Sequence, residues 1–316
     1  MSGRSGFLSA RADASSVLFM GLIAVLAQLT GVGLLLFPEL GALSNDILKR
    51  PHGAWASTPL LLVATPLATG IIGIAFASRM EFGVMAVLLD VGASVLVIHL
   101  LRSPIAPAIS AGLLPLVLGV HSVVYPLAIT VGTGLLALLS VLQRRFGISA
   151  SPRTVRDAVD DLMERPPAGT RWWPPFALAL LLVAGLAQWS GLHFLLFPPL
   201  VVIGFEMFAH PAVCPWAARP WRLPLACLVS AAAGVAAVTW LGSGALAAMV
   251  AMIAGIVGLR LLDLHAPPVL AVGLLPLVMP HPDGRFVGAV LAGTLLVTTV
   301  FELWRWMITG IRRPGF

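Results

Sequence analysis

Long apolar segments follow one another along almost the whole of this 316-residue chain. Hydrophobic residues make up 59% of the chain and charged residues only 10%, whereas a soluble domain carries roughly 25% charged residues. A helix needs about 20 apolar residues to cross a bilayer. The sequence therefore predicts an all-α integral membrane protein. The segments of about that length are 16–37, 57–78, 82–101, 121–143, 176–197, 222–241, 243–262 and 284–304.

The second half of the sequence repeats the first. Leu26–Leu40 and Leu186–Leu200 are identical at nine of fifteen positions, at an offset of 160. The hexapeptide GLLPLV occurs at 112–117 and again at 273–278. Such a long match predicts a tandem duplication. The expected organisation is a first membrane repeat at 1–150, a cytoplasmic amphipathic linker at 151–170 and a second membrane repeat at 171–316.

Each half also contains an apolar segment that is too short to cross a bilayer, at 104–119 and at 266–280. Both segments contain prolines, which interrupt a helix. Such backbone is tolerated at membrane depth only where protein or a wet cavity satisfies it. The sequence thus predicts about eight transmembrane helices in two tandem four-span repeats, each with one short re-entrant or broken helix.

Basic residues indicate the orientation, because Lys and Arg are enriched in cytoplasmic loops. Four spans in each half place both termini, the linker and the larger group of basic residues on one face. This predicts a multi-pass protein of the cell (inner) membrane with cytoplasmic termini and linker. Parallel repeats are favoured and inverted repeats stay open. The basic residues expected on the opposite face are Lys49, Arg50, Arg102, Arg219, Arg222, Arg260 and Arg285.

The polar linker is expected to form a short helix on the membrane surface. Ser151 and Pro152 suit the N-cap and the first helical position. The carboxylates of the linker are expected to face water, and a metal or acid–base pair there is the less favoured alternative. The apolar face would consist of Val155, Ala158, Val159, Leu162 and Met163, with Asp157, Asp160 and Glu164 off it.

Two Phe-Pro turns interrupt the chain at matching places, FPEL at 37–40 and FPPL at 197–200. Proline suits the first turn of a new helix. Free backbone N–H groups at such a break attract small anions, although a plain interfacial turn explains the pattern equally well. The candidate pathway residues at the turns are Phe37, Pro38, Glu39, Phe197, Pro198 and Pro199.

Asp90 is the most conspicuous charged group, because it lies near the middle of the segment 82–101. A charge at that depth costs about 2.5–3.5 kcal/mol, so it usually faces a cavity or a partner. Asp90 is therefore a candidate for proton binding or gating. Farther along, Arg260 and Asp263 are three residues apart and are expected to form an ion pair.

The stretch around His265, Pro267 and Pro268 resembles the HPP family of integral membrane proteins. A histidine and paired prolines precede a short apolar helix ending in LLPL, and FPPL and a proline-rich loop lie upstream. The family is described as four-span membrane proteins, and some members are linked to nitrite transport in chloroplasts and cyanobacteria. The resemblance implies that this chain is similar to a fused pair of such units. In the first half, Pro104 stands where His265 would be.

The predicted function is a membrane transporter or channel for a small inorganic anion, with nitrite as one candidate. Its site would lie between the repeats, where Arg260 or backbone N–H groups bind the anion and Asp90 or His265 carries a proton. The expected partners are the bilayer and the anion, without nucleic acid, and an oligomer is compatible with the sequence. Two alternatives are a non-transporting scaffold or sensor and, with less support, a membrane enzyme acting on a lipid-soluble substrate.

Sequence motifs for an enzyme are absent. The chain has no HExxH, no G-x-S-x-G and no paired-aspartate motif for a metal-bound diphosphate. Cys214 and Cys227 form no CxxC and are expected to be free thiols. The sequence therefore predicts no enzymatic activity, no cofactor and no metal site.

Overall fold

The computed structural model describes residues 2–146, 155–165, 167 and 169–309, and this part of the chain is helical without strands. Seven of its helices are long and apolar enough to cross a membrane. This confirms the all-α class and the multi-pass membrane character. The seven are α1 (Ser2–Thr30), α4 (Pro59–Ala77), α5 (Val84–Leu101), α7 (Val124–Arg145), α9 (Trp173–Ser190), α11 (Arg222–Leu241) and α14 (Gly284–Thr309).

The other helices are shorter. With 17 residues, α12 (Ala245–Leu261) is nearly as long as the seven. Four short helices complete the two halves: α2 (Glu39–Lys49), α6 (Ala108–Leu118), α10 (Pro198–Ala209) and α13 (Pro268–Leu274). The 3-10 turns are η1 (Gly33–Leu35), η2 (His193–Leu196) and η3 (Leu275–Val278), and α3 (Ala54–Ser57) and α8 (Val155–Met163) lie between the main helices.

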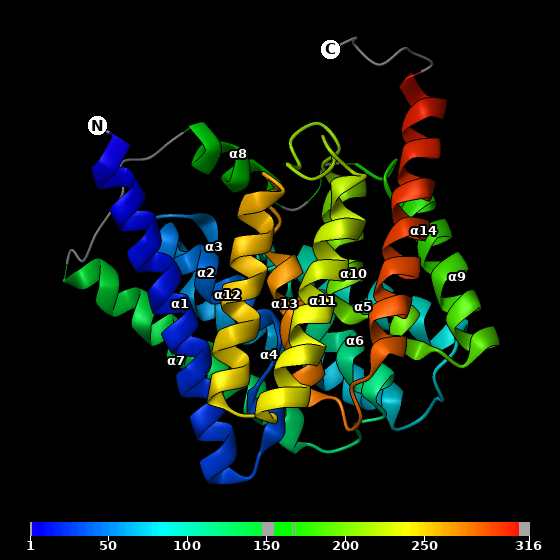
Figure 1. Ribbon diagram of the computed structural model, residues 1–316. Helices are drawn as coiled ribbons and strands as arrows, with labels where there is room; N and C mark the ends of the chain where they lie inside the picture. The colour runs from blue at the N-terminus through cyan, green and yellow to red at the C-terminus, as the bar shows by residue number, and fades with distance from the viewer. Residues whose placement is uncertain (1, 147–154, 166, 168, 310–316) are drawn as a thin grey trace.

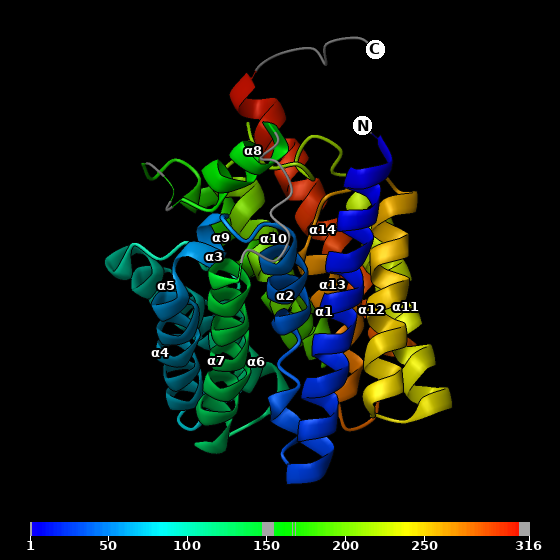
Figure 2. The same cartoon turned by 90° about the vertical axis from the view of Figure 1, so that its left-hand side faces the viewer.

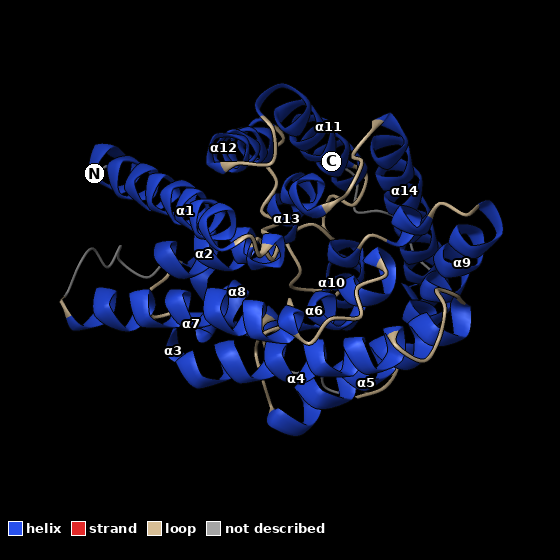
Figure 3. Cartoon of the chain, turned by 90° about the horizontal axis from the view of Figure 1, so that it is seen from below, coloured by secondary structure: helices blue, strands red, loops and turns tan. Residues whose placement is uncertain are grey.

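The short helices lie in the middle of the molecule, and the long helices surround them (Figure 3). They meet across the two halves: α2 packs against α13, and α10 packs against α6. The long helices cross over in the same way, since α1 packs against α12 and α9 against α5. The two halves are therefore interlocked, and the central helices are enclosed by protein.

Close helix packing depends on glycine at matching places. A Cβ atom on Gly73 of α4 would lie 1.9 Å from the carbonyl oxygen of Gly112, and one on Gly234 of α11 would lie 2.1 Å from that of Gly273. Both distances are far below van der Waals contact, so any side chain would push the two helices apart. The small residues of these segments thus pack against the broken helices, as expected for membrane helices.

Both halves begin and end at the same end of the molecule, where α8 lies (Figures 1 and 2). We call this the α8 end. Each Phe-Pro turn reverses the chain, so that α2 and α10 run back toward the α8 end, and α6 and α13 run away from it. Each half therefore contains two short helices that reverse or re-enter, where the sequence predicts one.

This path makes the expected separation of the basic residues wrong. Arg50 contacts Glu164, which directly follows α8, and Lys49 pairs with Asp13 of α1. Arg102, Arg219, Arg222 and Arg260 follow or precede helices at the same end. Among the lysines and arginines of the described residues, only Arg79, after α4, and Arg285, at the start of α14, lie at the opposite end (Figure 1).

Two local expectations also change. The first long helix ends at Thr30, not near residue 37, because Gly31 takes a left-handed conformation with φ of 71°. In α8 the carboxylate of Asp160 faces the protein, with 2% of the residue exposed, whereas Leu162 is 45% exposed. The linker carboxylates are therefore not a solvated face. Ser151 and Pro152 lie outside the described residues.

Candidate functional site

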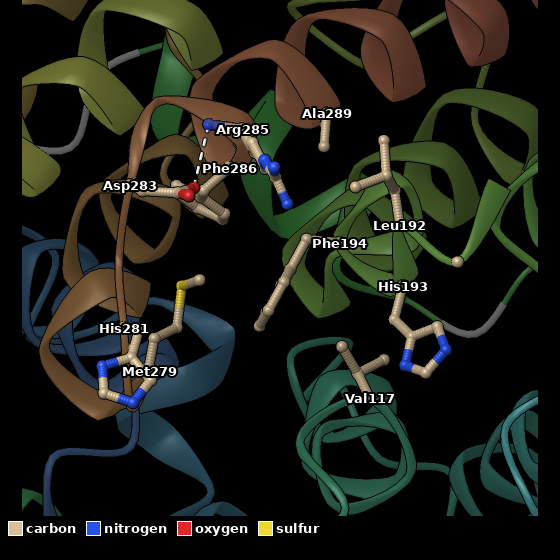
Figure 4. Close-up of a pocket in the computed structure, with 11 residues that line it drawn as sticks. Val117, Leu192, His193, Phe194, Met279, His281, Asp283, Arg285, Phe286 and Ala289 are labelled. Atoms are coloured by element: carbon tan, nitrogen blue, oxygen red, sulfur yellow. Dashed lines mark hydrogen bonds between the residues drawn. The ribbon is translucent and has the colours of Figure 1, made fainter.

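A pocket of about 220 Å³ opens at the end opposite α8 (Figure 4). Figure 4 shows the Arg285 side chain reaching into this pocket. The carboxylate of Asp283 accepts a hydrogen bond of 2.9 Å from the backbone N–H of Arg285 and so caps α14. The lining residues are Val117, Gly191, Leu192, His193, Phe194, Met279, His281, Asp283, Arg285, Phe286 and Ala289.

The pocket offers several hydrogen-bond donors around one guanidinium. Partial burial lowers the pKa of His193, which stacks on Phe82 with the ring centroids 4.2 Å apart. Neutral His193 is a hydrogen-bond donor or acceptor, and His281 adds a second imidazole. Arg285 supplies a permanent positive charge, and its guanidinium offers several donors in one plane. The carboxylate of Asp283 also lines the pocket, where it caps α14.

The interior of the first half contains two buried carboxylates. Neither oxygen of Asp90 on α5 has a hydrogen-bond partner among the described residues, whereas Glu39 on α2 lies beside the hydroxyl of Ser110. Both residues are fully or almost fully buried. Tyr125 of α7 lies within electrostatic range of the two carboxylates, and its hydroxyl donates a 2.7 Å hydrogen bond to the carbonyl of Ala111. The structure thus brings two predicted site residues together around one tyrosine.

A third group of polar residues, which we call the acidic cluster, closes the α8 end. Arg50 is at its centre: its Nε and Nη2 atoms each donate a 2.8 Å hydrogen bond to the carboxylate of Asp46. The same guanidinium contacts Glu164, and it approaches Asp161 at 3.3 Å. The full cluster consists of Asp46, Arg50, Asp160, Asp161, Glu164, Glu206 and His265.

The acidic cluster surrounds a small cavity of about 10 Å³, which has room for no more than one water molecule. His265 places its Nε2 atom 3.1 Å from Asp160. Pro267 and Pro268 line the same cavity. Three of the predicted site residues therefore lie here, at the junction of α8 with the central helices.

Charge in the acidic cluster is unbalanced. Burial, and then the charge of Asp46, raises the pKa of Glu164 to about 9, although Arg50 acts against both. Burial opposes the charge of Arg50, but the carboxylates of Asp46 and Glu164 raise the pKa of its guanidinium above its ordinary value. Arg50 is therefore permanently charged, whereas Glu164 retains a proton at neutral pH.

The expected ion pair between Arg260 and Asp263 is wrong. Arg260 contacts Asp13 of α1, and Asp263 pairs with Arg219 at 2.5 Å. The reason is the backbone: Asp263 follows the end of α12 with a left-handed φ of 46°, which turns its side chain away from the helix face. Neither residue joins the acidic cluster or the pocket.

The Phe-Pro turns start helices as expected. Pro38 is the N-cap of α2, Pro198 and Pro199 open α10, and both phenylalanines, Phe37 and Phe197, are buried in the core. An anion site was expected at the start of α2. Instead, the carboxylate of Glu39 lies in the first turn of this helix, where the anion would have bound.

Several groups of the site were missed from the sequence: Arg50, Glu164, Tyr125 and Arg285. One signal was present for Arg50, which lies four residues after Asp46 and can therefore reach it on a helix. Glu164 had been assigned to solvent. For Tyr125 and Arg285 the sequence offered no comparable pattern, because their neighbours are distant along the chain.

Comparison with known proteins identifies no relative: no family model, no curated protein and no solved structure matches this chain. The resemblance to the HPP family therefore stays a prediction from the sequence. The features of the molecule that bear on its function are its pocket, its buried carboxylates and its acidic cluster.

Proposed function

We propose that the protein is a proton-linked transporter of a small inorganic anion in the cell membrane, without enzymatic activity. The observation that carries the proposal is the pocket around Arg285. It is a cavity of about 220 Å³ that Arg285 and two histidines line, and it lies where the end of the central helix α6, at Val117, meets the η2 turn of the second half. Broken helices at such an interface are typical of transporter binding sites.

In this proposal the chain is a pair of parallel repeats, each built from four spans. The eight spans are the seven long apolar helices together with α12. The short helices α2, α6, α10 and α13 are the broken elements between the repeats. Matching contacts support this reading: Gly83 lies beside Gln188, and Gly244 lies beside Gln28. Both pairs join the halves at equivalent positions of the repeat.

The proposed orientation follows from the basic residues. All of those in the described part of the chain except Arg79 and Arg285 lie at the α8 end. Because Lys and Arg are concentrated on the cytoplasmic side, the α8 end and both termini are assigned to the cytoplasm. The pocket then opens to the outside, where the positive charge of Arg285 attracts anions.

The proposed path runs from the pocket along the central helices to the acidic cluster. Glu39 and Asp90 lie beside this path and are the groups that would take up and release a proton. The acidic cluster closes the path on the cytoplasmic side. The state described here is thus open outward and closed inward, as alternating access requires. Nitrite is the cargo that the HPP resemblance implies.

The test is uptake by proteoliposomes with nitrite, nitrate, formate and chloride, with and without a proton gradient. Arg285→Gln is expected to raise the half-saturating anion concentration roughly tenfold or more, because a charged hydrogen-bond donor is lost. Arg79→Gln is the matched control, since Arg79 is the other basic residue at that end and does not line the pocket. It is expected to leave uptake unchanged.

Equal uptake by the two variants would remove Arg285 from the site. If well-folded protein moves none of the four anions, transport of a small anion is excluded and a non-transporting scaffold becomes the better explanation. Uptake that does not depend on the proton gradient would exclude proton coupling and indicate an anion channel instead.

A further inference from the structure

Equivalent positions of the two halves differ at the acidic cluster in a way that suggests a second site. In the first half, Asp46 at the end of α2 is held by Arg50, four residues on. At the offset of 160, Glu206 stands for Asp46 and His210 stands for Arg50. The second half therefore replaces a permanently charged partner with an imidazole, which is titratable near neutral pH.

Glu206 is the least satisfied member of the cluster. It is 1% exposed, it lines the small cavity, and neither of its oxygens has a hydrogen-bond partner among the described residues. The Nε2 atom of His210 is likewise buried without a partner there. A buried carboxylate without partners is far more stable with a proton than without one.

The groups around Glu206 also favour its protonated form. The titratable groups around the same cavity are Asp46, Arg50, Asp160 of α8, Glu164 directly after α8, and His265. Cys214 and His210 follow α10 itself. Of the helices packed against α10, α14 brings the pair Glu302 and Arg305 to the α8 end, and α6, α9 and α13 contain no titratable residue. The carboxylates thus outnumber the cations, and an ionised Glu206 would add a further negative charge.

The linker segment around α8 contacts both halves near the acidic positions Asp46 and Glu206. Arg50 holds α8 from the first half through Glu164. In the second half, the His210 imidazole is hydrogen-bonded to the backbone of Arg165, directly after α8. Met163, 5% exposed, fills the wall of the cavity between them. We call this segment, 155–165, the α8 cap.

We propose that Glu206 and His210 form a proton-binding site, and that loss of the proton from Glu206 undocks the α8 cap from the central helices. The proton leaves to water on the side of the α8 cap, and the remaining carboxylate repels the carboxylates of Asp160, on α8, and Asp46. The ligand is a proton and not a metal ion, because the described His, Cys, Asp and Glu residues form no group that could hold a metal. This inference does not depend on anion transport.

The direction of the pH effect follows from Glu164 as well. Because the docked form raises the pKa of Glu164 to about 9, it binds a proton that a free carboxyl releases near pH 4.5. The stabilisation of the docked cap by this proton is therefore complete below about pH 4.5 and is lost as the pH rises through about 9. Alkaline pH is expected to release the cap.

The experiment measures thiol labelling of the purified full-length protein from pH 5 to pH 10. Met163→Cys reports on undocking, because residue 163 is buried under the cap. Leu162→Cys, exposed on the same helix, is the control for the ionisation of the thiol itself. Labelling is read at each position by peptide mass spectrometry, so that Cys214 and Cys227 stay in place.

The ratio of labelling at 163 to labelling at 162 is expected to be low at acidic pH and to rise about tenfold or more toward pH 10. Glu206→Gln, which keeps the group neutral, is expected to move this rise up by about one pH unit or to remove it. His210→Arg copies the first half and is expected to hold the cap docked at high pH. Glu302→Gln, an acidic position at the same end on α14, is the matched control.

A ratio that does not depend on pH would overturn the proposal. The proposal would also be overturned if the labelling ratio rose at the same pH in Glu206→Gln as in Glu302→Gln. Strong labelling of position 163 in Glu206→Gln at every pH would overturn it too. Where a variant fails to fold, amide hydrogen exchange of residues 155–165 in the unmodified protein, corrected for the intrinsic effect of pH, gives the same answer. Failure of anion uptake would leave these results unaffected.

Discussion

The two broken central helices have the same sequence, GLLPLV, but not the same structure. In the first half, α6 continues as an α-helix through Pro115 to Leu118. In the second half, α13 ends at Leu274 and the chain tightens into the 3-10 turn η3 around Pro276. Identical local sequence therefore does not decide which helix forms.

The difference lies in a neighbouring helix. A proline has no N–H, so Pro115 cannot donate to the carbonyl of Ala111, four residues earlier. The hydroxyl of Tyr125 on α7 supplies the missing hydrogen bond at 2.7 Å. At the equivalent position of α14 stands Phe286, which has no hydroxyl. We attribute the 3-10 turn in α13 to this missing donor, because a tighter turn re-pairs the backbone groups around proline.

The same contrast extends to the whole interior of the two halves. Glu39 and Asp90 are buried in the first half, and at the corresponding positions the second half has Pro199 and Ala251. The two halves thus share a packing scaffold, but their buried carboxylates lie at different positions: Glu39 and Asp90 in the first half and Glu206 in the second. In the proposed transporter, Glu39 and Asp90 therefore give the first half a role that the second half does not share.

The largest expected effect tests whether the two scaffolds are equivalent. Gly73→Val and Gly234→Val each place a side chain against the backbone of a broken helix, where even a Cβ atom would lie about 2 Å from a carbonyl oxygen. Each is expected to destabilise the protein by on the order of 3 kcal/mol or more, or to prevent folding. Thermal unfolding and gel filtration in detergent measure this.

Gly92→Val and Gly288→Val are the controls, one in each half, because a Cβ atom at either position meets no atom within 4 Å. Both should remain close to the parent protein. If only one of Gly73→Val and Gly234→Val is damaging, the halves do not share the same close packing, and the equivalence fails.

A smaller effect tests the polar interior. Asp90→Asn is expected to abolish the pH dependence of transport while the protein stays folded, because the amide fills the same space and cannot exchange a proton at these pH values. Its melting temperature should be unchanged or higher, since a buried carboxylate without partners is removed. Flux at several pH values and thermal unfolding give the two readouts.

Glu81→Gln, at an exposed acidic position before α5, is the control for a change of net charge. This control is expected to keep the pH dependence, and a pH dependence that also persists in Asp90→Asn would exclude Asp90 from proton transfer. Glu39 would then be the next group to replace.

Much of the architecture could be predicted from the sequence, because membrane helices are specified by local apolar length. The Phe-Pro helix starts and the buried position of Asp90 follow from residues close together in the chain. The sequence did not predict the end of the molecule at which Lys49 and Arg50 lie. Their position depends on the reversal of the chain at the Phe-Pro turn, which the apolar pattern does not reveal.

The acidic cluster could not have been predicted for a different reason. It is assembled from α2, α8, α10 and the loop before α13, which are far apart in the sequence. The helical pattern of the linker assigned Asp160 and Glu164 to solvent, because periodicity shows that two faces differ and not which one is covered. Only the position of Arg50 opposite α8 decides that the acidic face is buried.

The smallest expected effect tests the comparison of the two broken helices directly. Tyr125→Phe removes the donor to the Ala111 carbonyl and is expected to cost about 1–2 kcal/mol, the usual result of leaving a buried acceptor unpaired. Phe286→Tyr places a hydroxyl at the position equivalent to Tyr125, from which it is expected to donate to the carbonyl of Val272, four residues before Pro276, and to add up to about 1 kcal/mol. Thermal unfolding of the two single variants and of the double swap measures both changes. The opposite sign for Phe286→Tyr, or no loss in Tyr125→Phe, would show that the tyrosine hydroxyl does not explain why identical sequences form an α-helix in one half and a 3-10 turn in the other.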